Sequence, residues 1–134
     1  MRDLYSNIKV IHAITPQAVG TTGIAGGKLS GVLDRQGYDS VCFAYSSGAS
    51  ASVADTITPV VYECATTGGS FTSVADDDLN GTEAALTLTA AKSGKVGYRG
   101  NKRYLKLRLY GTGTATAIVG AVMVAGKADR APLS

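Results

Sequence analysis

Leucine occupies every second position between Arg103 and Tyr110, and this alternation constrains the fold more than any other feature of the sequence. Successive side chains of a β-strand point to opposite faces, so the segment separates into an apolar face and a polar face. The apolar face carries Leu105, Leu107 and Leu109, and the polar face carries Tyr104, Lys106, Arg108 and Tyr110. A narrow apolar strip needs a second layer to cover it, which predicts a packed β-sandwich.

Length and composition agree with one β-domain. The chain has 134 residues, of which 45% are hydrophobic, and this is enough for a single buried core. Its 17 glycines and its many Thr, Ala and Val residues favour short strands joined by tight turns. We therefore predict an all-β fold: a two-sheet antiparallel sandwich of jelly-roll type with about eight strands and little or no helix. The sandwich is expected to span residues 1–134, with short flexible arms at 1–6 and 127–134.

Other segments complete the predicted core. Residues 40–46 alternate like a core strand, and residues 57–65 resume a strand in which Pro59 favours an edge or a strand start. Residues 114–124 are apolar on both sides, as in the interior of a sheet. The residues that we expect to form the core are Leu105, Leu107, Leu109, Val41, Phe43 and Val60.

Turn residues divide these strands. A strand at 8–14 is expected to end at Pro16, and residues 71–74 are expected to form a hairpin with 57–65. Gly100-Asn101 suits a hairpin turn directly before the leucine-rich strand. Between residues 83 and 92, alanines favour a helix whereas the Leu-Thr alternation favours a strand, and we predict the strand.

No segment carries a recognisable catalytic motif. His12 is the only histidine and has no acid, base or metal ligand near it in sequence. The glycine-rich loop at 20–27 has neither the Walker spacing nor the dinucleotide-binding spacing of nucleotide sites. Cys42 and Cys64 are predicted to be reduced, buried thiols. We predict no enzyme activity and no cofactor.

A calcium loop is suggested only by its opening residues, Asp76, Asp78 and Asn80. The twelfth position of such a loop needs a carboxylate and is Thr87 here, so the segment is predicted to be an acidic turn without a metal. Whether the three residues bind a cation is left open.

Charge and hydropathy limit the partners. The net charge of +3, from 13 basic and 10 acidic residues, predicts no nucleic-acid partner. The N-terminal segment lacks a signal-like apolar region, and no segment approaches the roughly 18 apolar residues of a membrane span. We expect synthesis in a cytoplasm and no membrane partner.

Several turn and strand segments carry a resemblance to a known group, and their order runs along nearly the whole chain. They are residues 1–8, 37–40, 62–63, Phe71, Val74, 78–83 and 96–104. With these segments the chain resembles small proteins encoded among the head genes of tailed bacteriophages. Within that group it looks like jelly-roll capsid decoration, or cement, proteins. The chain departs from that pattern at 20–27 and at 84–91, where surface details are not carried over.

The resemblance implies a structural virion protein that is made in the bacterial cytoplasm and stabilises a phage head by binding the outer surface of the shell. Its partners would be the major capsid protein and other copies of itself, with a dimer preferred. The alternative is a carbohydrate-binding or tail-associated adhesion module of a phage. No tryptophan is present to stack on sugars, although seven tyrosines are.

Tyrosines and cations gather on the polar face of the leucine-rich strand and before it. Tyr and Arg are enriched at protein interfaces, so this face is the predicted capsid or partner contact. It comprises Arg99, Lys102, Tyr104, Lys106, Arg108 and Tyr110. A solvated sheet face is the other interpretation of these residues, and the terminal arms at 1–5 and 127–134 are competing contacts.

Overall fold

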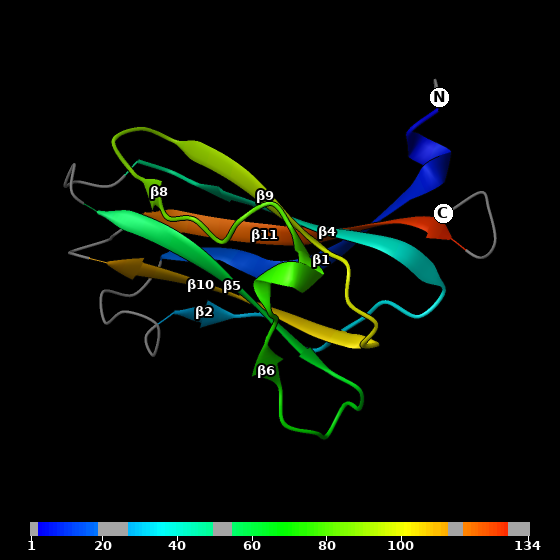
Figure 1. The fold of residues 1–134 in the computed structure, drawn as a ribbon. Helices are drawn as coiled ribbons and strands as arrows, with labels where there is room; N and C mark the ends of the chain where they lie inside the picture. Colours follow the sequence, from blue (N-terminus) through cyan, green and yellow to red (C-terminus); the bar gives the residue numbers. More distant parts are fainter. Residues whose placement is uncertain (1–2, 19–26, 50–54, 113–116, 129–134) are drawn as a thin grey trace.

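The structure is a computed structural model that describes residues 3–18, 27–49, 55–112 and 117–128. Over these ranges it contains eleven β-strands and two 3-10 turns, η1 (Tyr5–Asn7) and η3 (Asp76–Asp78). All strand pairs are antiparallel, and the strands form two sheets (Figure 1). The predicted all-β antiparallel sandwich is confirmed, but the described residues form eleven strands rather than about eight, because five of them are only two residues long.

Sheet A has five strands and sheet B has six. The strand order of sheet A is β1 (Ile8–Ala18), β11 (Ile118–Ala128), β4 (Tyr38–Ser47), β9 (Lys92–Tyr98) and β7 (Leu79–Asn80). The order of sheet B is β2 (Lys28–Leu29), β10 (Tyr104–Thr112), β5 (Thr56–Cys64) and β6 (Thr72–Ser73), with β3 (Leu33–Asp34) paired to β10 and β8 (Leu86–Thr87) paired to β5.

The core lies between the two sheets. The three alternating leucines of β10 are fully buried, as predicted, and Val41 and Phe43 of β4 are buried as well. They pack in one hydrophobic cluster with residues of both sheets, among them Ile57, Val61, Val96, Val119 and Met123. The apolar alternation in the sequence therefore identified one wall of the core and part of the opposite wall.

The prediction that Val60 belongs to the core is wrong. Val60 is cross-strand to Arg108 and half-exposed, whereas Pro59 and Val61 are buried. The two adjacent valines gave no alternation from which to choose the inward residue. The pairing of Pro59 with Leu109 decides it, because directly opposed residues point to the same face of a sheet.

Pro59 lies where β5 is an edge. Strand β8 pairs with Thr56 and Ile57, and β6 pairs with Tyr62 and Glu63, so the ladder on this side is interrupted between them. Proline has no N–H to donate, which makes such a gap the place where a strand tolerates it. The expectation that Pro59 marks an edge fits this position.

Glu83 fills part of the same gap. The N–H of Val61 donates a hydrogen bond of 2.7 Å to Oε2 of Glu83, and the carbonyl of Val61 accepts one of 2.9 Å from the N–H of Val74. Burial raises the pKa of the half-buried Glu83 carboxyl, and the charge of Asp76 adds to this, while the hydrogen bond from Val61 opposes it. A side chain thus takes the place of a missing strand neighbour.

The predicted hairpin at Gly100-Asn101 is also wrong, because β9 belongs to sheet A and β10 to sheet B. The segment between them crosses one end of the sandwich. Arg35 donates from its guanidinium to the carbonyls of Lys102 and of Gly100, the latter at 3.1 Å. Tyr98 Oη donates to Glu63 and accepts the N–H of Lys102 at 3.0 Å. A connection that changes sheet needs these side chains, since no ladder supports it.

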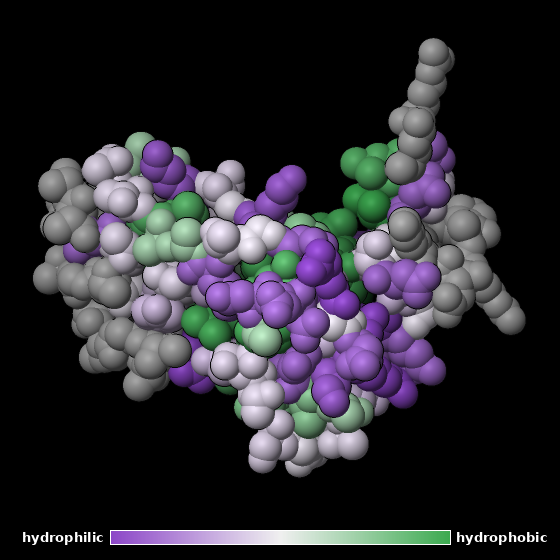
Figure 2. Space-filling model, viewed as in Figure 1, coloured by the Kyte–Doolittle hydropathy of each residue, from purple (hydrophilic) through white to green (hydrophobic). Residues whose placement is uncertain are grey.

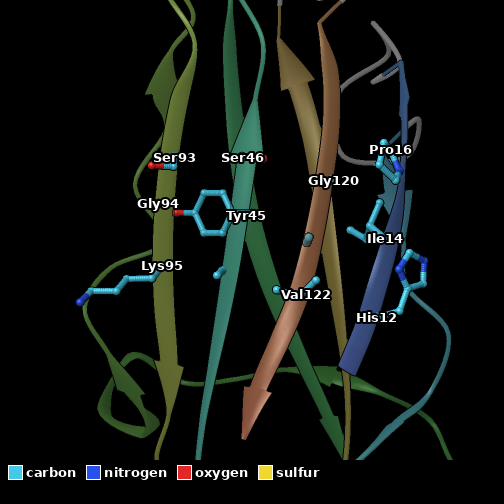
Figure 3. A pocket seen from close by; sticks show the side chains of 12 residues that line it. His12, Ile14, Pro16, Tyr45, Ser46, Ser93, Gly94, Lys95, Gly120 and Val122 are labelled. Carbon is cyan, nitrogen blue, oxygen red and sulfur yellow. The ribbon is translucent and has the colours of Figure 1, made fainter. Parts of the chain in front are cut away.

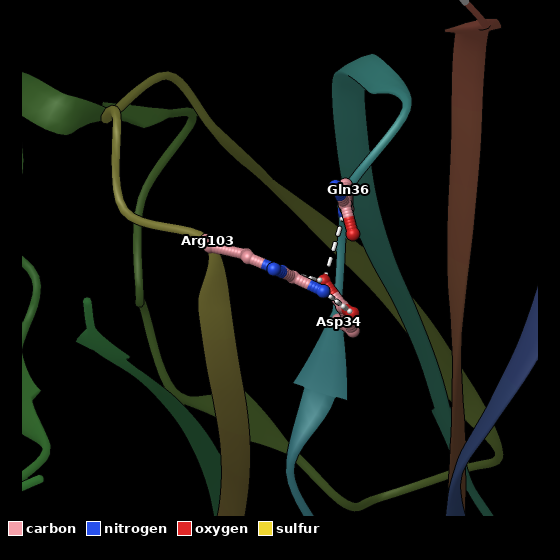
Figure 4. Close-up of polar contacts among 3 residues, drawn as sticks. All are labelled: Asp34, Gln36 and Arg103. Atoms are coloured by element: carbon pink, nitrogen blue, oxygen red, sulfur yellow. Dashed lines mark hydrogen bonds and ion pairs between the residues drawn. The ribbon is translucent and has the colours of Figure 1, made fainter. Parts of the chain in front are cut away.

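An ion pair closes the same end. The guanidinium of Arg103 donates to both carboxylate oxygens of Asp34, at 2.9 and 2.8 Å, and the N–H of Gln36 donates to Asp34 at 2.9 Å (Figure 4). The hydrogen bonds from Arg103, against a smaller effect of burial, hold the pKa of Asp34 below its usual range. Figure 2 shows hydrophilic side chains gathered over this end of the molecule.

Several predicted boundaries differ from the structure. β1 does not end at Pro16 but continues to Ala18 through two irregularities in its pairing with β11, which an edge strand tolerates. Residues 83–92 contain only the two-residue strand β8 and the first residue of β9. β11 extends to Ala128, so the predicted arm at 127–134 includes strand residues, while residues 129–134 lie outside the described ranges.

Among the described residues, the structure has no helix whose length and apolar content would let it cross a membrane.

Leu107→Asp is expected to prevent folding, because Leu107 is fully buried and the variant would place a charge among apolar side chains. Lys106→Asp changes the next residue of the same strand on the half-exposed outer face, so this control should fold. Circular dichroism and thermal unfolding of the two variants test the inward and outward assignment. A soluble Leu107→Asp protein with the melting temperature of the wild type would contradict it.

Glu83→Gln is expected to change how stability depends on pH. The folded state holds the Glu83 proton more tightly than the unfolded chain does, so the contribution of this group is complete below its unfolded pKa and is lost as pH rises through the folded pKa. Relative to wild type, the variant should gain stability as pH rises from the usual glutamate pKa of about 4.3 through the raised pKa of the folded state.

Asp34→Asn serves as a control, because its stability relative to wild type should fall, not rise, as pH increases. The pKa of Asp34 is lowered in the folded state, so its contribution is present above the unfolded pKa and is lost as pH falls through the folded pKa. Urea unfolding at a series of pH values measures both trends. Parallel stability profiles for wild type and Glu83→Gln would show that Glu83 does not titrate differently on folding.

Candidate binding groove

The outer face of sheet A is hollowed. One hollow of about 720 Å³ lies over β1, β11, β4 and β9, and a second of about 520 Å³ lies beside it. Lys95 lines both, so we treat the two hollows as one feature, the sheet A groove. Figure 3 shows His12 on β1 and Lys95 on β9 at opposite sides of the larger hollow.

Strand register explains which residues form this surface. Three cross-strand rows bring together mostly small side chains, one of them over three of the long strands and two over all four. They are Gly120, Ser46 and Ser93; then His12, Val122, Ala44 and Lys95; then Val10, Val124, Cys42 and Gly97. The side chains of Gly, Ala, Ser and Val extend only a short distance from the sheet, whereas the longer side chains at the borders extend further and enclose a hollow.

Two glycines of β9 are required by close approaches to neighbouring strands. A Cβ at Gly94 would lie 2.7 Å from the ring of Tyr45, and a Cβ at Gly97 would lie 2.9 Å from Cβ of Asn80. The Tyr45 ring is buried, and burial, with smaller effects from the charges of Glu83 and Cys42, raises its pKa. The strand can therefore lie against both neighbours only without side chains at these positions.

The groove has polar groups at its borders. The ring of His12 shares a hydrogen bond of 3.0 Å between Nε2 and the Thr15 hydroxyl. Hydroxyl, amide and ammonium groups complete the set, from Ser40, Ser46, Ser93, Asn80 and Lys95. Such groups form hydrogen bonds with polar ligands.

Cys42 lies on the groove floor as a free thiol. Burial raises its pKa, although the nearby charge of Lys95 acts in the other direction. Nucleophilic cysteines have a lowered pKa, so Cys42 lacks the electrostatics of a reactive thiol. Cys64 is also free, and both cysteines are half-buried, so the prediction that they are buried is wrong.

The predicted contact residues divide into two groups. Tyr104, Lys106, Arg108 and Tyr110 lie together on the outer face of sheet B, where all four are half-exposed. Arg99 follows β9 and donates to the carbonyl of Asp77 at 2.7 Å, while Lys102 lies in the segment that connects the sheets. Four of the six residues therefore share one surface.

Aromatic rings stack with the cations of this surface. Lys106 Nζ lies 4.5 Å from the centroid of Phe71, Arg108 Cζ lies 5.7 Å from that of Tyr62, and Arg103 Cζ lies 4.9 Å from that of Tyr104. We call this surface the tyrosine–cation face. These contacts hold the long side chains in place, which lowers the entropy lost on binding a partner.

The acidic turn does not gather metal ligands. In the parts of the chain that the structure describes, no three His, Cys, Asp or Glu side chains are placed to share a metal ion. Asp76–Asp78 form η3, and Arg99 binds the backbone carbonyls of Asp77 and Asp78. The segment acts here as a turn that ties β9 to η3.

No protein-family model and no curated protein sequence matches this chain. Solved structures do match it in fold. The infectious bursal disease virus structure, Gx strain, matches with a TM-score of 0.52 at 12% identity, over 88% of this chain and 31% of the viral chain. The chain is thus a jelly-roll β-sandwich, a fold found in a viral protein.

Two further matches come from one Clostridium thermocellum enzyme. The N-terminal modules of endo-1,4-beta-D-xylanase 10B, complexed with xylohexaose, match with a TM-score of 0.51 at 11% identity, over 97% of this chain and 28% of that one. The C-terminal family 22 carbohydrate binding module of that xylanase matches with a TM-score of 0.51 at 9% identity, over 93% and 89%. Identities this low support a shared fold and do not by themselves transfer a ligand.

The sheet A groove was missed by sequence reasoning. His12 was considered alone, whereas the structure places it in a row with Lys95 through Val122 and Ala44. These residues come from four strands far apart in the chain. The one available signal was the low side-chain volume of Cys42, Ala44 and Ser46 on the outward positions of β4.

Proposed function

We propose that this protein is a non-catalytic binding module that holds a saccharide chain in the sheet A groove. The observation that carries the proposal is the groove itself, a low floor of Gly, Ala and Val bordered by hydroxyl, amide, imidazole and ammonium groups. A sugar ring presents apolar C–H groups on its faces and hydroxyl groups at its edges. The floor suits the faces, and the borders suit the hydroxyls.

The fold supports the same proposal. Two of the structures that share it are parts of a xylanase, one complexed with xylohexaose and one a carbohydrate binding module. Tyr45 is the only tyrosine that lines the larger hollow, and its ring is buried. Without an exposed aromatic platform we expect weak binding, with a Kd on the order of 1 mM, or about −4 kcal/mol.

Ala44→Tyr is expected to reduce saccharide binding by at least about tenfold, or ~1.4 kcal/mol, because the ring would occupy the centre of the groove. Val60→Tyr makes the same kind of change on the half-exposed outer face of sheet B and should leave binding unchanged. Chemical-shift titration with xylo-oligosaccharides and with a panel of bacterial glycans provides the measurement. Wild-type spectra that show no shifts in groove residues with any glycan would reject the proposal.

A second candidate function is capsid decoration, in which the protein binds the major capsid protein on the exterior of a phage head. It is favoured by the resemblance to phage head proteins along the sequence and by the fold shared with the bursal disease virus structure. The tyrosine–cation face supplies a suitable surface, since Tyr and Arg are enriched in interface hot spots. A protein that binds only the assembled shell stabilises the shell without catalysis.

Lys106→Glu combined with Arg108→Glu is expected to weaken binding to undecorated phage shells by at least about tenfold. The reason is that the double variant reverses the charge of two cations on the tyrosine–cation face. Co-sedimentation with shells measures this, and Ala44→Tyr is the matched control on the opposite sheet. Wild-type protein that stays in the supernatant would reject decoration. Equal binding by wild type and the double variant would move the contact to another surface.

A further inference from the structure

We propose that the sheet A groove selects acidic saccharides, with the ammonium group of Lys95 binding their carboxylate groups. This inference rests on the proposed saccharide function and adds the ligand class and the residue that selects it. It comes from the distribution of charge around the groove.

Among the residues that the structure describes, no Asp or Glu lines either hollow. The ionisable side chains that line the larger hollow are His12, Tyr45 and Lys95, and those of the smaller one are Cys42 and Lys95. Burial raises the pKa of both Tyr45 and Cys42, so these two stay neutral near neutral pH. Lys95 is therefore the main fixed charge among the described lining residues, and it makes a positive contribution to the potential within the groove.

Two carboxylates of the described residues are engaged outside the groove. Glu83 accepts the N–H of Val61 at the edge of sheet B, and Asp34 pairs with Arg103 at the end of the sandwich. Within the described ranges, no carboxylate lies within ion-pair distance of Lys95. The ammonium group is thus available to a ligand, and binding one does not require breaking a protein ion pair.

The position of Lys95 lets its ammonium group contact a ligand in either hollow. It is cross-strand to Ala44 in the central row and lines both hollows. Figure 3 shows its side chain extending outward from β9 at the border, opposite His12. A four-carbon stem with free rotation can bring the ammonium group to a carboxylate on either side of that position.

A carboxylate is favoured over a neutral hydroxyl for two reasons. A charge-assisted hydrogen bond is about twice as strong as a neutral one. Long-range attraction also raises the local concentration of an anionic ligand in a groove that lacks negative charge. Neutral saccharides retain only the apolar floor and the hydroxyl contacts.

The test compares sugars matched in length. Trigalacturonate and triglucuronate carry a carboxylate on each residue, whereas galactotriose and xylotriose carry none. Isothermal titration calorimetry and chemical-shift titration with wild-type protein are expected to show at least about tenfold tighter binding of the acidic pair. The preference should decrease as salt is raised, because the Lys95 side chain is exposed.

Two lysines of β9 provide a matched pair of variants. Lys95→Gln is expected to remove the preference for acidic sugars while keeping the weak binding of neutral ones. Lys92→Gln changes an exposed lysine three positions earlier, on the opposite side of the strand, and should keep the full preference. Equal loss in both variants would overturn the inference, since it would indicate a general effect of net charge.

The other outcomes separate this inference from the proposed function. Equal affinity of wild type for acidic and neutral sugars overturns acid selection and leaves the saccharide function supported. Acid preference that survives Lys95→Gln overturns the role of Lys95. Absence of groove shifts with all four sugars and with the wider glycan panel overturns the saccharide function together with this inference.

Discussion

Face-to-face packing of the two sheets is the interaction on which the rest of the structure depends. The leucines of β10 and the inward residues of β5 meet Phe43, Val96 and Met123 of sheet A, and all of these side chains are buried. Burial of a large aliphatic or aromatic side chain contributes about 1.5–3 kcal/mol, so this contact dominates the stabilising free energy. It also fixes strand register, because a slip of one residue would exchange the inner and outer residues of a whole strand.

Once register is fixed, each sheet acquires an outer face whose chemistry follows from the outward residues. Sheet A presents mostly small side chains and becomes hollowed, whereas sheet B presents rings stacked on cations. The difference extends to β9, where Gly94 and Gly97 leave room for Tyr45 and Asn80 of the neighbouring strands. Larger residues there would push those strands apart and deform the groove. The glycines thus serve the packing of sheet A and the shape of its surface together.

The sequence predicted those parts of the fold in which one strand contains the whole signal. The alternation at Leu105, Leu107 and Leu109 predicted both a strand and its inward face, and residues 114–124 correctly indicated the interior strand β11. Val60 was misassigned because its neighbour Val61 is equally apolar, so only pairing with β10 distinguishes them. Gly100-Asn101 looked like a hairpin turn because local turn chemistry does not specify whether the next strand joins the same sheet. The groove was beyond prediction, since it needs the register of four strands at once.

The two outer faces lie on opposite sides of a core about 10 Å thick, the usual spacing of packed sheets. At physiological salt the Debye length is about 8 Å, so charges exposed on one face contribute little to the potential at the other. Side chains without shared contacts also affect stability and binding nearly additively. A saccharide in the sheet A groove and a protein on the tyrosine–cation face would therefore bind almost independently. The two proposed functions, saccharide recognition and shell binding, are for this reason compatible in one molecule, and variants on one sheet test one proposal while leaving the other face intact.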